Sequence, residues 1–178
     1  MADDKVLELL KKTNSILEGH FLLSSGLHSS QYLQCARLLQ HPVYAEEVCS
    51  KIAIKFKDAD IDVVVAPALG GILVSYEVAR SLGVRGLFVE RINGKMQLRR
   101  GFELMKNERV LVVEDVITTG LSTREVIAIV KAHNAKLAGI GCIIDRGTEI
   151  NFGVRFESLL KLNIPVFFPC EESNEYRQ

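Results

Sequence analysis

Two adjacent carboxylates stand in the segment of this chain that is best suited to chemistry. The segment reads VLVVEDVITTGLST, from Val110 to Thr123, and it places Glu114 and Asp115 directly after an apolar run. The run predicts a strand buried on both faces of a parallel sheet. The two acids are therefore expected at its carboxyl end, the edge at which such sheets bind ligands. A helix is predicted to begin near Leu121.

The residues between the acids and this helix have the composition of a phosphate cradle. Thr118, Thr119 and Gly120 would lie at a helix N-terminus, where free backbone N–H groups, hydroxyls and the helix dipole hold anions. The chain has no GxxxxGK[ST] loop, which excludes the common nucleoside triphosphate loop. Two carboxylates would repel a bare phosphate. A phosphorylated ribose uses both features, because its hydroxyls donate to the acids while the loop holds its phosphate.

The elements that would position this segment alternate between strand and helix. Apolar runs predict strands at 62–66, 86–90, 109–115 and 135–145, and further edge strands at 156–162 and 166–168. Helical patterns cover 72–82, where Gly83 ends the helix, and 122–133. Alternation at this spacing predicts right-handed crossovers. We therefore expect an α/β fold with a central parallel β-sheet flanked by helices, in a single domain over residues 1–178.

The first part of the chain predicts two helices around a polar segment. Residues 4 to 17 show a helical period, and so does the stretch that Pro42 opens. The Ser-rich piece between them, 19–39, fits short strands or a hood-like loop better than a helix. The side chains expected to face inward are Val6, Leu9, Leu10, Thr13 and Leu17 in the first helix, and Val43, Val48, Ile52 and Phe56 in the second.

Composition and charge favour a soluble cytoplasmic protein. Hydrophobic residues make up 48% and charged residues 25% of 178 residues, and the formal net charge is zero, which disfavours a nucleic-acid partner. The N-terminus carries acids where a signal peptide is basic, and no apolar stretch is long enough to span a membrane. The four cysteines lie far apart, without a CxxC pair, and are interpreted as reduced, space-filling thiols: Cys35, Cys49, Cys142 and Cys170.

The segment EDVITTG resembles the phosphoribosyl pyrophosphate (PRPP) signature of the type I phosphoribosyltransferases. Further segments, over about residues 5 to 168, resemble the orotate phosphoribosyltransferases. The hood of that family is resembled by GHFLLSSGLHSSQYLQCARLLQHP, and its pyrophosphate loop and helix by PALGGILVSYEVARSLG. The short basic catalytic loop of one bacterial branch is resembled by ERINGKMQLRRGF, and a late strand of the family by CIIDRG. The resemblance implies the type I fold with a small N-terminal hood of about residues 1–40. It also implies transfer of ribose 5-phosphate from PRPP to orotate, giving orotidine monophosphate and pyrophosphate in UMP biosynthesis.

The resemblance also implies roles for individual residues. Orotate would contact Thr118 and Arg146, and the residues implied in catalysis are Glu114, Asp115, Lys95, Arg99 and Arg100. Mg²⁺ is the implied cofactor, held mainly by pyrophosphate and by no side chain alone. A homodimer that shares the catalytic loop is implied, as is a cis peptide at Ala68–Leu69. PRPP would be bound by Glu114, Asp115, Val116, Ile117, Thr118, Thr119, Gly120, Leu121, Ser122, Leu69, Gly70, Gly71, Arg91 and Lys95.

Several alternatives remain open at this point. The chain could be a purine phosphoribosyltransferase, a non-catalytic regulator that senses PRPP, or a plain α/β binding module. The basic run at 91–101 could be a solvated surface hairpin, and Arg146 a surface arginine. The chain also departs from some family members, which carry lysines where it has Ser24 and Gly70 and an aromatic residue where it has Leu69. The contacts to pyrophosphate are therefore the least defined part of the expected site.

Overall fold

The computed structural model describes residues 2–22, 28–147, 150–164 and 166–167, and the structural statements below concern these residues. Ser24 and Cys170, named above, lie outside them. In the described part of the chain, none of the helices is both long and apolar enough to cross a membrane. Cys35, Cys49 and Cys142 are buried and unbridged, which confirms their interpretation as space-filling thiols.

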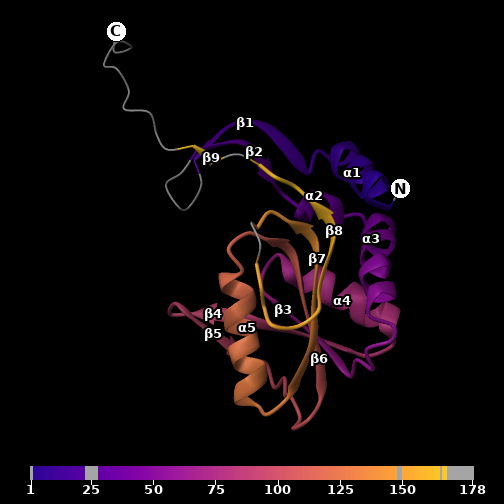
Figure 1. Ribbon diagram of the computed structural model, residues 1–178, viewed down its shortest axis with the longest axis vertical. Coiled ribbons are helices and arrows are strands. Elements are labelled where there is room, and N and C mark those ends of the chain that lie inside the picture. The colour runs from indigo at the N-terminus through magenta and orange to yellow at the C-terminus, as the bar shows by residue number, and fades with distance from the viewer. Residues whose placement is uncertain (1, 23–27, 148–149, 165, 168–178) are drawn as a thin grey trace.

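A six-stranded sheet forms the centre of the molecule, in the order β5-β4-β3-β6-β7-β8 (Figure 1). Every neighbouring pair runs parallel except β4 and β5, which form a hairpin. The predicted α/β fold with a central, mostly parallel sheet is confirmed. The strands are β3 (Val63–Pro67), β4 (Arg85–Ile92), β5 (Lys95–Leu98), β6 (Arg109–Ile117), β7 (Lys136–Asp145) and β8 (Phe156–Lys161).

Helices cover both faces of this sheet, and β6 shows why its sequence is apolar throughout. On one side α3 (Pro42–Lys55) and α4 (Gly71–Leu82) pack with Leu111 and Val113, and on the other α5 (Leu121–Ala132) packs with Val110 and Val112. Alternate side chains of a strand point to opposite faces, so both sets are buried. Figure 1 shows α5 in front of the sheet and α4 behind it.

A second, three-stranded sheet contains strands from the predicted hood. It pairs β1 (Ile16–Leu22) with β2 (His28–Leu33) and β2 with β9 (Val166–Phe167), all antiparallel. The helices α1 (Ala2–Lys12) and α2 (Ala36–Leu39) flank these strands in the chain. Strand β9 comes from the other end of the sequence, so this sheet is built from both ends of the chain.

The predictions for two residues of the N-terminal part, Leu17 and Val43, were wrong. The first helix ends at Lys12, because Asn14 adopts a left-handed conformation with φ of 51° and turns the chain; Leu17 lies in β1 instead. Val43 is 72% exposed, whereas Val48, Ile52 and Phe56 are buried as expected. Val43 precedes Val48 by five residues, which rotates it by about 140° from the buried stripe.

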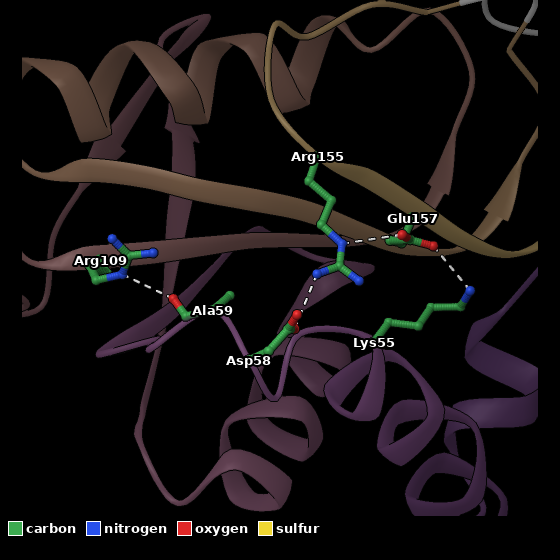
Figure 2. Close-up of polar contacts among 6 residues, drawn as sticks. All are labelled: Lys55, Asp58, Ala59, Arg109, Arg155 and Glu157. Carbon is green, nitrogen blue, oxygen red and sulfur yellow. Dashed lines mark hydrogen bonds and ion pairs between the residues drawn. The ribbon is translucent and has the colours of Figure 1, made fainter.

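A polar cluster joins α3 to the amino-terminal edge of the sheet, opposite the acids of β6. Arg155 donates to Asp58 at 3.1 Å and to Glu157 at 3.2 Å, while Lys55 donates to Glu157 at 3.1 Å; Figure 2 shows these contacts. Beside it, Arg109 donates from Nε to the carbonyl of Ala59 at 2.9 Å. These contacts connect the end of α3 and the loop after it with β8 and β6.

Candidate active site

The two acids lie within β6, slightly before its end. The pairing of β6 with β7 continues to Ile117, whose carbonyl accepts the N–H of Arg146 at 2.8 Å. Val116 and Ile117 still belong to the strand, so only residues 118–120 connect β6 to α5. Helix α5 begins at Leu121, as expected.

Glu114 and Asp115 point to opposite sides of the sheet. The hydroxyl of Thr123, in the first turn of α5, donates to Oε2 of Glu114 at 2.6 Å. Asp115 lies instead against the turn that precedes α4, where a Cβ added to Gly70 would be 2.7 Å from both of its carboxylate oxygens. The strand alternation thus directs one acid toward each of the two loops that the sequence assigned to phosphate groups.

Both loops lead into helix N-termini whose N-cap residue is a glycine and provides no side-chain cap. Gly70 precedes α4 and Gly120 precedes α5, and neither helix has an acid in its first turn. At α5 the hydroxyl oxygen of Thr119 accepts the N–H of Leu121 in a long hydrogen bond of 3.4 Å. The first N–H groups of each helix lack intrahelical partners, and the helix dipole favours negative charge there. The edge of the sheet therefore offers two anion-binding ends with an acid directed toward each.

Local packing explains the glycines in these loops. Gly120 has φ of 74°, and an added Cβ would lie 2.9 Å from the ring of Phe152. Gly71 packs on β3, since its Cβ would lie 2.7 Å from that of Ala66. The peptide between Ala68 and Leu69 is cis, as the resemblance implied, and the Leu69 side chain is 84% exposed.

Burial changes the ionisation of the two acids. It raises the pKa of Glu114 to about 7, the hydrogen bond from Thr123 opposes this rise, and the nearby charge of Asp115 adds to it. Burial also raises the pKa of Asp115, against backbone hydrogen bonds that lower it. Carboxyl groups with a raised pKa at a ligand-binding edge are typical of functional sites, because a cationic ligand stabilises their ionised form.

Thr118 and Arg146 come together at the ends of the neighbouring strands β6 and β7. A Cβ added to Gly147, next to Arg146, would lie 2.8 Å from the carbonyl oxygen of Thr118. Arg146 is partly buried, and this burial lowers its guanidinium pKa. Among the described residues no acidic side chain pairs with it, so the fork of the guanidinium is available to an anionic ligand.

The basic run forms the β4–β5 hairpin, whose two-residue turn consists of Asn93 and Gly94, both with positive φ. Two of the three arginines in this run are engaged within the chain. Arg91 pairs through both terminal nitrogens with Glu125 of α5, and Arg100 donates to Glu90 at 2.8 and 2.7 Å. For Lys95 and Arg99 the described part of the chain provides no ion-pair partner.

The sequence reasoning did not identify Thr123, Glu125 or Glu90 as parts of this region. Thr123 stands inside the quoted motif, but its contact with Glu114 depends on how α5 packs on β6. Glu125 lies two residues further along α5. The ion pairs of both glutamates cross from one element to another or along a hairpin, so the spacing in the sequence gives no signal for them.

Comparisons with known proteins identify the family. A model of the phosphoribosyl transferase domain matches residues 34–152. Orotate phosphoribosyltransferase of Caldanaerobacter subterraneus subsp. tengcongensis is 54% identical over 168 residues, covering 94% of this chain and 88% of that protein. The chain belongs to the orotate phosphoribosyltransferase family. A second member, from Thermotoga maritima, is 53% identical over 165 residues, covering 92% of this chain and 88% of its own length.

Solved structures agree with membership of this family. The crystal structure of orotate phosphoribosyltransferase from Aeropyrum pernix superposes with a TM-score of 0.74 at 28% identity, covering 88% of this chain and 93% of that one. Adenine phosphoribosyltransferase from Thermoanaerobacter pseudethanolicus reaches a TM-score of 0.72 at 16% identity, a likeness of fold alone. As a member of the orotate phosphoribosyltransferase family, the chain is an enzyme of the phosphoribosyltransferase class.

Proposed function

We propose that this protein transfers ribose 5-phosphate from PRPP to N1 of orotate, forming orotidine monophosphate and pyrophosphate, a step of UMP biosynthesis. The observation that carries the proposal is the placement of Glu114 and Asp115 between two helix N-termini whose N-cap residue is a glycine. PRPP has an anionic group at each end of a ribose that carries two free hydroxyls. Its 5-phosphate fits residues 118–122, the loop before α5 and the first two residues of that helix, its hydroxyls fit the acids, and its pyrophosphate fits the 69–71 turn.

Orotate would bind beside the ribose, at the ends of β6 and β7. It is an anion, and the half-buried guanidinium of Arg146 is suited to pair with its carboxylate, with Thr118 next to it. A purine base has no carboxylate to match this arginine. The fit of Arg146 therefore favours orotate over the purine alternative.

In the reaction, the bond from C1 of ribose to the pyrophosphate oxygen breaks ahead of formation of the bond to N1 of orotate. Orotate reacts with N1 already deprotonated, so this step needs no general base. Positive charge then develops on the ribose ring, where the fixed carboxylates of Glu114 and Asp115 stabilise it. The pyrophosphate leaves with the electron pair of the broken bond, and the cations of the 91–100 hairpin neutralise it. Closure of this hairpin would exclude water, which otherwise hydrolyses the activated sugar.

Mg²⁺ enters this proposal as part of the substrate, bound to pyrophosphate oxygens. Among the described residues no group of three or more His, Cys, Asp or Glu side chains is arranged to hold a metal. Mg²⁺ commonly retains several waters and binds through substrate phosphates, so it does not need a dedicated protein cage.

We further propose a cytoplasmic homodimer in which the hairpin of one subunit serves the site of the other. The test mixes two inactive variants, Asp115→Ala and Lys95→Ala. Because each mixed dimer contains one site with both functional residues, sharing predicts partial recovery of activity. A mixture that stays inactive, or an active monomer in sedimentation, would exclude sharing.

The decisive experiment for the proposed reaction follows orotate loss spectrophotometrically with PRPP and Mg²⁺, with adenine and hypoxanthine as competing bases. We expect turnover with orotate alone. Asp115→Asn should lower turnover by about 10²-fold, the scale of one lost preorganised electrostatic group. Turnover with a purine base would establish the alternative enzyme. PRPP binding without turnover of any base would favour the regulator.

A further inference from the structure

Glu114 depends on one side chain of α5 for its orientation. Thr123 is fully buried, and its hydroxyl donates to Oε2 of Glu114 at 2.6 Å. In the described part of the chain this is the only side-chain hydrogen bond to that carboxylate. A hydrogen bond to a charged group in a site of low dielectric is short and strong, so it fixes one oxygen and leaves the other for a ligand.

The neighbouring groups Cys142 and Asp115 do not orient the carboxylate of Glu114. Cys142 lies beside it on β7, in register, and burial together with the charges of Asp145 and Glu114 raises the pKa of this thiol well above its usual range, so it stays neutral. Asp115, the next residue of β6, points to the other side of the sheet and adds negative charge. The hydroxyl of Thr123 is thus the contact that favours the ionised form of Glu114 against burial.

Thr123 also belongs to the element that would hold the 5-phosphate. It is the third residue of α5, whose first turn and preceding loop form the cradle. We infer that Thr123 is a positioning residue, which sets the carboxylate of Glu114 in fixed register with the 5-phosphate cradle so that both ends of the ribose are bound by one rigid unit. This inference rests on the proposed binding of PRPP.

Substitutions at this position separate positioning from simple packing. Thr123→Val keeps the volume and removes the donor, Thr123→Ala removes both, and Thr123→Ser keeps the donor. Ser75→Ala is the matched control, because Ser75 is also a buried helical hydroxyl but donates to the carbonyl of Leu87, away from the acids. The measurements are the pH profile of kcat/KM for PRPP and the melting temperature.

We expect Thr123→Val to lower kcat/KM at neutral pH by about tenfold or more, as for the loss of a hydrogen bond to a charged group. Without the donor the pKa of Glu114 rises further, so the acidic limb of the profile should move to higher pH and much of the loss should recover in alkaline buffer. Thr123→Ser should follow the wild type. Ser75→Ala should melt earlier with an unmoved profile.

Profiles of the Val and Ala variants that superimpose on the wild type would overturn the inference, whatever their melting temperatures. The Ala variant keeps the test open if the Val variant does not fold. If the wild type turns over no orotate, the proposed function has failed. Calorimetric binding of ribose 5-phosphate over the same pH range then tests the link between Thr123 and Glu114 separately, with the same shift expected.

Discussion

The carboxylate of Asp115 occupies the space in which a side chain at residue 70 would begin. A Cβ on Gly70 would lie 2.7 Å from both carboxylate oxygens, closer than real contacts allow. The backbone of Gly70 is in an ordinary helical conformation, with φ of −56°, so the close approach of Asp115 explains the glycine. We expect Gly70→Ala to displace Asp115, to destabilise the protein by about 1–3 kcal/mol through overpacking, and to lower turnover.

A double-mutant cycle tests whether the contact with Asp115 is the reason for glycine at position 70. In an Asp115→Ala background the carboxylate is gone, so adding Gly70→Ala should cost little further free energy of unfolding in urea. Residues in contact show such non-additivity, whereas distant ones do not. Equal costs in the two backgrounds would mean that the alanine is disfavoured for a reason unrelated to Asp115.

The ionisation of Glu114 predicts how stability varies with pH. Burial raises its pKa in the folded protein to about 7, above the ordinary value of 4.5 in the unfolded chain. The folded state therefore binds the proton of the Glu114 carboxyl more tightly than the unfolded chain does. The stability that this protonation contributes is complete below about pH 4.5 and is lost as pH rises through about 7. The loss is on the order of 3 kcal/mol. Asp115 acts in the same direction.

Urea unfolding of the wild type and Glu114→Gln between about pH 5 and 8.5 measures this effect. The free energy of unfolding of the wild type should fall relative to that of the amide variant as pH rises, because the amide does not titrate. A constant difference would show that Glu114 is already ionised at the acidic end of the range.

The sequence predicted the sheet well because its signals there are local. The apolar runs of β3 and β6 and the glycine that ends α4 at Gly83 each act within a few residues, and the structure agrees with them. The direction of each acid was not predicted, although the alternation of β6 requires neighbours to point apart. The contacts of Thr123 with Glu114 and of Glu125 with Arg91 join separate elements, so only the packed fold brings them together.

The cluster around Arg155 is expected to support the fold without contributing to catalysis. The cluster (Figure 2) lies at the amino-terminal edge of β8, opposite the acids. The guanidinium of Arg155 also stands 5.0 Å from the centre of the Phe56 ring. Arg155→Met, which keeps an apolar chain over Phe56, should lower the melting temperature slightly, because its ion pairs are partly exposed and weak. Turnover should not change. A loss of turnover in a fully folded variant would contradict this assignment.

The two arginines at the end of the basic hairpin should differ in their effect on substrate. Arg100 is held by Glu90 through two hydrogen bonds and stands over the Phe88 ring at 5.7 Å, so it must break these contacts before it can meet a phosphate. Arg99 has no ion pair to break among the described residues. Arg99→Ala is therefore expected to weaken binding of PRPP by about tenfold, the usual range for a hydrogen bond to a charged group, and Arg100→Ala by less. Both losses should be greatest at low salt, where the attraction is least screened.

Glu90→Gln frees Arg100 and should strengthen PRPP binding under the same conditions, in an Arg99→Ala background as well. Titration of Mg²⁺ and PRPP against these variants at two ionic strengths measures each effect. An Arg100→Ala variant that loses more affinity than Arg99→Ala would mean that the pair with Glu90 opens when substrate binds.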